Sequence, residues 1–280
     1  NVMAAHVEGF GSIDNIAIAK GEIYEGLSEQ GIAIINVDDH YAPQWVLQNE
    51  HRSTLTYSVN PAQHPQADIQ AHNIQQNNTG CVCFQLHING VQVSVSLNVL
   101  GLHNVANALA AAACAYALGM DVQAIAQGLE NFTGVAGRLQ RLHGINDSTI
   151  IDDSYNANPS SVCAAIDVLA DVPAKKILVL GDMAELGSGT LKAHQDIGLY
   201  GRDKNIDYLL TVGAHMKAAS DRFAVNNFHF DHMDQLIEAA KVMADSQTVF
   251  LIKGSRSSRM DKVVQALIQR GENNNASLVS

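Results

Sequence analysis

One stretch of the chain gathers residue types that bind nucleotides and support group transfer. It runs from Thr149 to Ser161 and reads T-I-I-D-D-S-Y-N-A-N-P-S-S. Ile150 and Ile151 predict a buried strand, and Pro159 suits the first turn of the helix that should follow. Open α/β sheets place ligands at the carboxyl ends of their strands. The acids, amides and hydroxyls in between are therefore a candidate site, and an ordinary loop with solvated acids is the alternative.

Two further polar loops follow predicted strands. Residues 181–187 read G-D-M-A-E-L-G, and residues 253–257 read K-G-S-R-S directly after the apolar run Val249 to Ile252. Loops that follow adjacent parallel strands line one rim of a sheet. The second loop is basic and rich in hydroxyls, which suits a carboxylate or a phosphate. A solvated basic turn is the alternative.

Amide and guanidinium groups occur at two more positions. His103, Asn104 and Asn107 open an alanine-rich helix, and their spacing puts Asn107 on the same face as the other two. A helix start with amide side chains could hold a base or an anion, although simple capping is an equal alternative. Arg138 follows the small-residue stretch 133–137 and could clamp a phosphate with two hydrogen bonds; a plain surface arginine is the alternative.

Composition and missing motifs exclude several classes of protein. The chain contains neither a complete G-x-x-x-x-G-K-[ST] loop nor a G-x-G-x-x-G after a strand, which disfavours a nicotinamide dehydrogenase. A net charge of −11, from 28 acidic and 17 basic residues, disfavours a nucleic-acid partner. No apolar run is long enough to span a membrane, and four cysteines do not make a disulfide framework. We therefore expect a cytoplasmic protein.

The predicted elements fall into two parts, as 280 residues allow. The first part should begin with a helix from Ile13 to Leu27 and contain the alanine-rich helix 102–118. Its strands should be 32–37, 54–59, 68–74, 81–88 and 91–97, with Asn89-Gly90 as a hairpin turn. The second part alternates strands with helices, which specifies a doubly wound α/β fold with a mostly parallel sheet. Its predicted strands are Ile150 and its neighbours, 177–180, 208–212 and 249–252, and its helices are 159–170, 191–201, 214–223, 233–244 and 259–270.

Taken together, these motifs resemble the Mur ligases, ATP-dependent amide-forming enzymes of bacterial cell-wall synthesis. The resemblance runs from Asn1 to about Ile268. It is greatest to the members that add D-alanyl-D-alanine, and the D-N-P-R motif of the sister type that adds the third residue is missing. The motifs that carry it are A-A-H-V-E-G-F-G-S (4–12), A-K-G-E-I (19–23), G-L-H-N-V-A-N-A-L-A-A-A (101–112), G-R-L (137–139), D-D-S-Y-N-A-N-P (152–159), G-D-M-A-E-L-G (181–187) and K-G-S-R-S (253–257).

The resemblance implies a domain plan. Residues 1–134 would be the C-terminal part of a P-loop-type central ATPase domain with an appended antiparallel sheet. Residues 135–270 would be a Rossmann-like C-terminal ligase domain, and residues 271–280 a disordered tail. The family's UDP-binding domain, its P-loop and a magnesium-binding glutamate would then lie upstream of Asn1. Such a fragment is not expected to turn over ATP by itself, and the 134–137 stretch is the expected hinge.

The resemblance also implies residue roles. His6 and Lys20 correspond to magnesium ligands that act in catalysis, Lys20 after N-carbamylation, because a carbamate offers Mg²⁺ a hard oxygen ligand. The residues expected to bind ATP are Asn104 and Asn107 at the adenine and Arg138 and Asp153 at phosphate and ribose. The residues expected to contact the other substrates are Asn156, Asn158, Lys253, Ser255 and Arg256.

The implied reaction is an amide ligation. ATP would phosphorylate the terminal carboxylate of UDP-N-acetylmuramoyl-tripeptide, and the amine of D-Ala-D-Ala would attack the resulting acyl phosphate. The implied cofactors are ATP and Mg²⁺, and a monomer without a nucleic-acid partner is expected. Two alternatives stay open: another ligase of the superfamily, such as a folylpolyglutamate-synthase type, and a non-catalytic nucleotide-binding relative.

Overall fold

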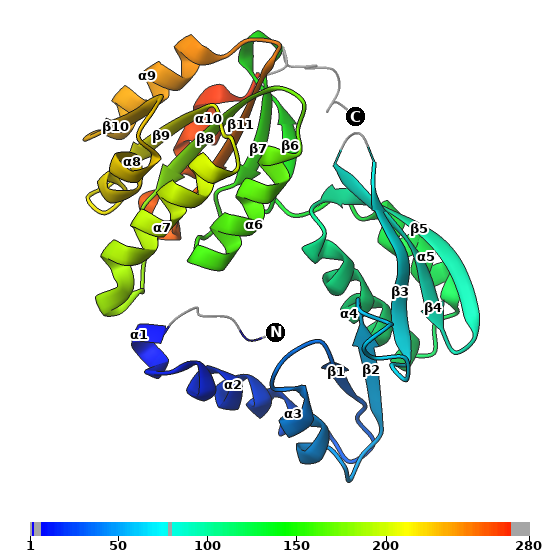
Figure 1. The fold of residues 1–280 in the computed structure, drawn as a ribbon. Coiled ribbons are helices and arrows are strands. Elements are labelled where there is room, and N and C mark those ends of the chain that lie inside the picture. The colour runs from blue at the N-terminus through cyan, green and yellow to red at the C-terminus, as the bar shows by residue number, and fades with distance from the viewer. Residues whose placement is uncertain (1, 3–6, 78–79, 270–280) are drawn as a thin grey trace, which may run out of the picture.

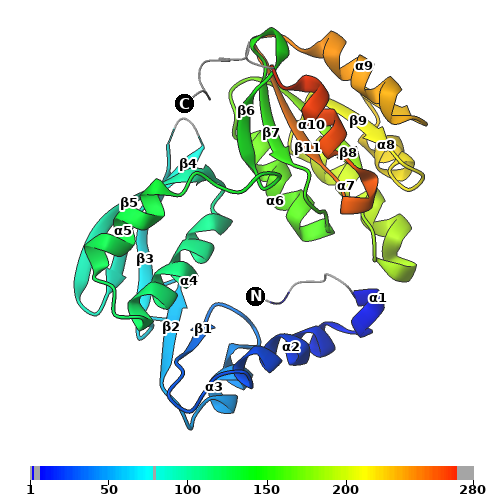
Figure 2. The same ribbon diagram turned by 180° about the vertical axis from the view of Figure 1, so that it is seen from behind.

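The computed structural model describes residues 2, 7–77 and 80–269, and it contains two separate β-sheets. Figures 1 and 2 show these sheets in different halves of the molecule, joined by the chain between α5 and β6. We refer to the halves as the first and second units. The division at residue 134 stays a prediction, as does the tail, since residues 271–280 lie outside the described part of the chain.

The first unit is built on a five-stranded sheet in the order β1-β2-β3-β4-β5. β1 to β3 run parallel, whereas β3, β4 and β5 pair antiparallel, so the expected antiparallel strands continue the parallel ones in one sheet. Asn89 and Gly90 both have positive φ, as the predicted hairpin turn requires. The elements are α1 (Val7–Phe10), α2 (Ile13–Gly21), β1 (Ala33–Asn36), α3 (Ala42–Gln48), β2 (Thr54–Ser58), β3 (Ile69–Gln76), β4 (Cys81–Ile88), β5 (Val91–Leu100), α4 (His103–Ala117) and α5 (Val122–Asn131).

Small side chains position α4 against this sheet. Leu109, Ala112 and Ala113 are fully buried in one cluster with Val82 and Leu86 of β4. Alanine permits close approach of the helix backbone, and it is the best helix former. The alanine-rich helix therefore lies where it can present its first residues, the amide-bearing turn, at the end of β5.

The second unit is a six-stranded sheet in the order β10-β9-β8-β11-β7-β6. The strands β10, β9, β8, β11 and β7 are parallel and β6 is antiparallel, which confirms the predicted doubly wound α/β fold. The elements are β6 (Gln140–His143), β7 (Thr149–Asp153), α6 (Pro159–Ala170), β8 (Lys175–Gly181), α7 (Thr190–Asp203), β9 (Tyr208–Val212), α8 (Lys217–Phe223), β10 (Asn227–Phe230), α9 (Met233–Met243), β11 (Thr248–Lys253) and α10 (Asp261–Leu267).

Alternating side chains of these strands feed two hydrophobic clusters, one on each face of the sheet. Ile151 and Leu251 point to the face covered by α6, α7 and α8, whereas Ile150 and Phe250 point to the face covered by α9 and α10. Figure 1 shows α6 and α7 in front of the sheet, and Figure 2, from behind, shows α10 in front. Burial on both faces explains why the central strands read as continuous apolar runs.

The structure differs from the sequence-based elements at several places, and the short helices α1 and α3 were not predicted. The helix predicted from Ile13 to Leu27 ends at Gly21, where a short 3-10 turn lets Tyr24 pack near Trp45 with ring centroids 6.3 Å apart. The strands β6 and β10 were not predicted. Both are edge strands with few buried side chains, so neither carries a strong apolar pattern.

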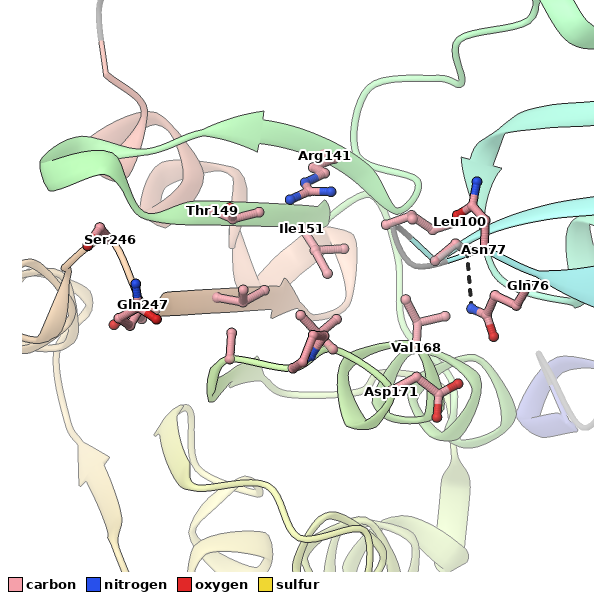
Figure 3. Close-up of a pocket in the computed structure, with 16 residues that line it drawn as sticks. Gln76, Asn77, Leu100, Arg141, Thr149, Ile151, Val168, Asp171, Ser246 and Gln247 are labelled. Carbon is pink, nitrogen blue, oxygen red and sulfur yellow. Dashed lines mark hydrogen bonds between the residues drawn. The ribbon is translucent and has the colours of Figure 1, made fainter.

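A large cavity of about 670 Å³ separates the two units at the amino ends of β7 and β11. Figure 3 shows Gln76, Asn77 and Leu100 of the first unit on one side of it and Thr149 and Ile151 on the other. The polar loops of the sequence analysis follow the carboxyl ends of the same strands. This cavity therefore lies at the opposite end of the sheet from the candidate site.

Candidate functional site

Three polar loops meet at one edge of the second sheet, as the sequence predicted. β11 lies between β8 and β7, and Lys253 at its end is in register with Asp153 on β7 and Leu180 on β8. The loops after these three strands are therefore neighbours. One detail differs from the expectation: Asp152 and Asp153 still belong to the strand β7, rather than to the polar loop after it, and both are buried.

Asp153 and Lys253 form a buried ion pair at the centre of this edge. Lys253 Nζ donates to Asp153 Oδ2 at 2.5 Å and to the Asn156 carbonyl at 2.9 Å, and the Leu139 amide donates to Asp153 Oδ1 at 3.2 Å. The side chain of Lys253 is only 3% exposed and that of Asp153 only 13%. Burial raises the pKa of Asp153 above its ordinary value, although the Lys253 ammonium and the Leu139 amide oppose the rise.

The loop after β7 is held by its own side chains. Asp152 Oδ1 accepts hydrogen bonds from the Ser154 amide at 3.0 Å and from the Ser154 hydroxyl at 2.6 Å. Asn158 caps α6: its Oδ1 accepts from the Ser161 amide at 2.9 Å, and the Ser161 hydroxyl accepts from the Asn158 amide at 3.0 Å. The Asn158 side-chain oxygen, expected at a substrate, thus has a capping role in this structure.

Asn104 and Asn107 from the first unit face this edge. Asn107 Nδ2 donates to Asn104 Oδ1 at 2.9 Å, and Asn104 Nδ2 donates to the Leu100 carbonyl at 2.7 Å. Gly101 has a φ of +92°, and a side chain there would meet the His103 imidazole. The turn before α4 therefore fixes the direction of both amide side chains.

The two units together enclose a cavity of about 420 Å³. It brings together all four residues predicted to bind ATP and three of the five predicted at the other substrates. Its polar lining comprises His103, Asn104, Asn107, Arg138, Asp153, Tyr155, Asn156, Asn158, Ser160, Ser161 and Lys253.

A second, mostly apolar cavity of about 550 Å³ adjoins the first and shares Asn104, Asn107 and Arg138 with it. Its walls are side chains of β5, α4, α5 and the linker, including Val99, Ala111 and Leu129, which leave a smooth surface. A polar cavity beside an apolar one suits a ligand with a charged part and a flat apolar part.

A third cavity of about 360 Å³ lies between the loops that follow β8 and β11, and it shares Asn156 and Asn158 with the first cavity. It is lined by Ala184, Glu185, Leu186, Ser255, Arg256 and Ser257 as well. Ser255 is buried; its amide donates to the Asp182 carbonyl at 2.9 Å, and its hydroxyl lies 3.0 Å from that of Ser257. Ser255 therefore joins the K-G-S-R-S loop after β11 to the G-D-M-A-E-L-G loop after β8.

His194 is a buried residue that the sequence analysis missed. Its Nε2 accepts from the Met183 amide at 3.1 Å, so its Nδ1 carries the proton and donates to the Thr190 carbonyl at 2.7 Å. Burial lowers the pKa of His194 below its ordinary value, and the hydrogen bond to Thr190 opposes this only in part. A neutral histidine thus holds the G-D-M-A-E-L-G loop; its position on the buried face of α7 was the available signal.

Tyr155 also went unnoticed in the sequence. Its ring centroid lies 4.4 Å from Cζ of Arg138 and 5.6 Å from Cζ of Arg256. These distances are those of cation–π contacts. Tyr155 thus joins the arginine predicted to hold phosphate to the arginine predicted to meet the other substrates.

Of the predicted magnesium ligands, only Lys20 lies within the described residues. Lys20 is exposed at the end of α2 and lines none of the three cavities, and His6 falls outside the described residues. Across residues 7–77 and 80–269, no three His, Cys, Asp or Glu side chains gather as metal ligands would. Within that part of the chain, the side chains therefore do not form a complete Mg²⁺ site.

Comparisons with known proteins agree with this architecture. The sequence model of the Mur ligase middle domain matches residues 1–115, and that of the Mur ligase, glutamate ligase domain matches residues 137–256. UDP-N-acetylmuramoyl-tripeptide–D-alanyl-D-alanine ligase of Escherichia coli is 41% identical over 273 residues, which cover 97% of this chain and 59% of that protein. The corresponding Haemophilus influenzae protein is 35% identical, covering 95% of this chain and 58% of its own length.

Solved structures give the same result. MurF from Acinetobacter baumannii superimposes with a TM-score of 0.84 at 31% identity, covering 95% of this chain and 57% of that one. MurF from Thermotoga maritima shares the fold with a TM-score of 0.81 at 23% identity, over 95% of this chain and 60% of that one. The chain thus spans somewhat under two thirds of the relatives it matches. With both of its units matched by the family's domains, the chain belongs to the Mur ligase family.

Proposed function

We propose that the protein containing this chain is an ATP-dependent ligase that adds D-Ala-D-Ala to UDP-N-acetylmuramoyl-tripeptide in the cytoplasm. The observation that carries the proposal is the cavity between the units, in which Asn104 and Asn107 of one unit face Arg138 and Asp153 of the other. Its support from relatives is the 41% identity with an enzyme of that name. A monomer suffices for this site.

The nucleotide is proposed to bind across the two adjoining cavities. The adenine ring would lie in the apolar one, where the amides of Asn104 and Asn107 can meet its polar edge. Arg138 would hold phosphate with its planar guanidinium, and Asp153 can still accept from a ribose hydroxyl through its remaining lone pairs. A structure of MurF from Thermotoga maritima was solved in complex with ADP, which supports a nucleotide as the ligand.

The other substrates are proposed to occupy the third cavity. Arg256 suits a carboxylate or phosphate there, and the hydroxyls of Ser255 and Ser257 can accept or donate hydrogen bonds. Asn156 and Asn158 belong to both the first and the third cavity. The transferred phosphoryl group would therefore lie where the two cavities meet.

The proposed reaction has two steps. A terminal carboxylate oxygen of the tripeptide attacks the γ-phosphorus of ATP, which forms an acyl phosphate and releases ADP. The amine of D-Ala-D-Ala then attacks the acyl carbon, and phosphate leaves from the tetrahedral intermediate as the amide forms. Positioning and charge neutralisation carry most of the catalysis in phosphoryl transfer, which is the role proposed for Arg138. Lys20 carbamylation and Mg²⁺ binding belong to the proposal as expectations.

The test is product formation by the full-length protein. It receives MgATP, UDP-N-acetylmuramoyl-tripeptide and either D-Ala-D-Ala or glutamate, and products are measured by mass spectrometry. We expect a UDP-muramoyl-pentapeptide and one ADP per product with D-Ala-D-Ala, and nothing with glutamate. Product with glutamate would favour the folylpolyglutamate-synthase type, and no product with any amine would favour a non-catalytic relative. The 280-residue chain alone, which lacks a G-x-x-x-x-G-K-[ST] loop, is expected to release no ADP.

An arginine pair supplies the matched variants. Arg138→Ala should lower kcat/KM by about 100-fold, since a charge-assisted contact to the transferred group is lost. Arg141→Ala is the control, because Arg141 lines the cavity at the opposite end of the sheet. Equal effects of the two substitutions would remove Arg138 from the proposed site.

A further inference from the structure

Two arginines from different loops converge on one tyrosine ring. Arg138 lies in the linker and Arg256 in the loop after β11, yet their Cζ atoms are 4.4 Å and 5.6 Å from the centre of the Tyr155 ring. The guanidinium carbons are therefore no farther apart than these two distances together. Like charges at such a separation repel each other, so this arrangement needs a compensating group.

No carboxylate among the described residues pairs with either guanidinium. Neither guanidinium is ion-paired or hydrogen-bonded through its side chain in the part of the chain that the structure describes. Asp153, the buried acid that lines the cavity with Arg138, is already paired with Lys253. The two arginines thus leave a positive field directed at an open site.

Tyr155 is held in place by the backbone of Gly137. Its amide donates to the Gly137 carbonyl at 3.1 Å, which joins the residue before Arg138 to the loop after β7. Gly137 has a φ of +76°, and an added Cβ would lie 3.1 Å from the Tyr155 amide nitrogen and 3.2 Å from Tyr155 Cβ. Only glycine therefore permits this close approach.

The ring stands at the boundary between two cavities. Tyr155 and Arg138 line the cavity proposed for the nucleotide phosphates, whereas Arg256 lines the cavity proposed for the other substrates. Tyr155 is 45% exposed, so a ligand can reach the two guanidinium groups beside its ring.

We propose that Tyr155 is a positioning residue that holds Arg138 and Arg256 as a two-arginine clamp for one phosphate-bearing anion. The clamp needs the ring, whose face attracts both cations, rather than the hydroxyl, for which the structure records no hydrogen bond within the described residues. That this anion is the acyl phosphate formed between the cavities rests on the proposed function. The clamp itself rests only on the geometry.

The experiment measures pyrophosphate binding to the 280-residue chain by isothermal titration calorimetry. This chain has no P-loop motif, so bound pyrophosphate reports on the arginines rather than on a second phosphate site. Tyr155→Leu should weaken binding about five- to twenty-fold, because two cation–π contacts are lost, and Tyr155→Phe should restore affinity to within about two-fold of the unsubstituted chain. Tyr200→Leu is the matched control, since Tyr200 lies on α7 outside the site and its ring centroid is 5.2 Å from Lys204 Nζ.

A double-mutant cycle separates positioning from general loss of structure. Arg256→Gln alone should weaken binding about ten-fold, and the Tyr155→Leu/Arg256→Gln chain should bind only slightly more weakly than either single variant. Additive losses, an equal loss in Tyr155→Phe, or an unsubstituted chain that does not bind pyrophosphate would each overturn the clamp. The proposed function fails separately: a full-length protein that makes no pentapeptide would refute it even if the chain still binds pyrophosphate through Tyr155.

Discussion

At the scale of single residues, the site depends on a buried charge pair. Lys253 and Asp153 are almost fully removed from solvent, and their remaining polar atoms bond to the backbone of Asn156 and Leu139. Such a pair contributes little net stability, but removing one partner leaves an uncompensated charge in a poorly solvated place. The pair therefore fixes the ends of β7 and β11 relative to each other.

The residue-scale prediction concerns the free energy of unfolding. Lys253→Met should lower it by about 3–5 kcal/mol, whereas Lys253→Met combined with Asp153→Asn should recover much of that loss, because no buried charge is then unpaired. Urea unfolding followed by circular dichroism measures both values. The control is Lys175→Met, whose partner Asp245 is 54% exposed, and its effect should stay within about 1 kcal/mol. A single-variant loss as small as the control's would contradict the structural role of the pair.

At the scale of elements, the linker between α5 and β6 has a fixed end and a free end. Gly137 is tied to the loop after β7 through the Tyr155 amide. Thr133 and Gly134 make no backbone hydrogen bond to either unit within the described chain, and a Cβ on Gly134 would meet only Val99 at 3.4 Å. The hinge expected over 134–137 is thus best placed at Gly134.

The element-scale prediction compares two prolines in the full-length protein. Gly134 has a φ of +92°, which proline cannot adopt, so Gly134→Pro should change how the units approach and lower kcat on the order of 10- to 100-fold. Its melting temperature should remain close to that of the unsubstituted protein. Gly137→Pro should also lower the melting temperature, because it disrupts the contact with Tyr155. Steady-state kinetics and calorimetry distinguish the two variants. An unchanged kcat in Gly134→Pro would contradict a hinge at Gly134.

At the scale of the whole molecule, the hydrophobic clusters divide between the two units. The clusters on the two faces of the second sheet are distinct from the cluster under α4. Among the described residues, only Leu100 and the partly buried Cys81 of the first unit belong to a cluster of the second unit. Cavities separate the units at both ends of the second sheet. In the described residues, no helix is long and apolar enough to cross a membrane. Contact between the units is therefore made by the linker, the site and a small apolar contact of Leu100 and Cys81.

The prediction at this scale is a calorimetric one. The 280-residue chain should unfold in two transitions, one for each unit, since little apolar surface joins them. ADP at 100 times its dissociation constant should stabilise the chain by about 2.7 kcal/mol and bring the transitions together, because it binds both units at once. Arg138→Ala should abolish this shift and leave the ligand-free transitions in place. A single transition without nucleotide would contradict the independence of the units.

Much of this protein follows from its sequence. The apolar runs at 208–212 and 249–252 specified buried parallel strands, because a strand covered on both faces must be apolar throughout. Asn89-Gly90 specified a hairpin, and Pro159 the start of α6. The position of the loops after β8, β11 and β7 at one end of the sheet also followed, since parallel strands have their carboxyl ends on the same side, whereas the order of the three strands did not.

Other features exist only in the folded structure. The pairing of Asp153 with Lys253 joins residues 100 positions apart, and no local pattern encodes it. The same holds for Tyr155 between two arginines and for His194 beneath its loop. The edge strands β6 and β10 also escaped prediction, because an edge strand buries too few side chains to show a period. Local periodicity reports how a segment is covered, whereas the partners of a polar side chain depend on which strands the tertiary fold places side by side.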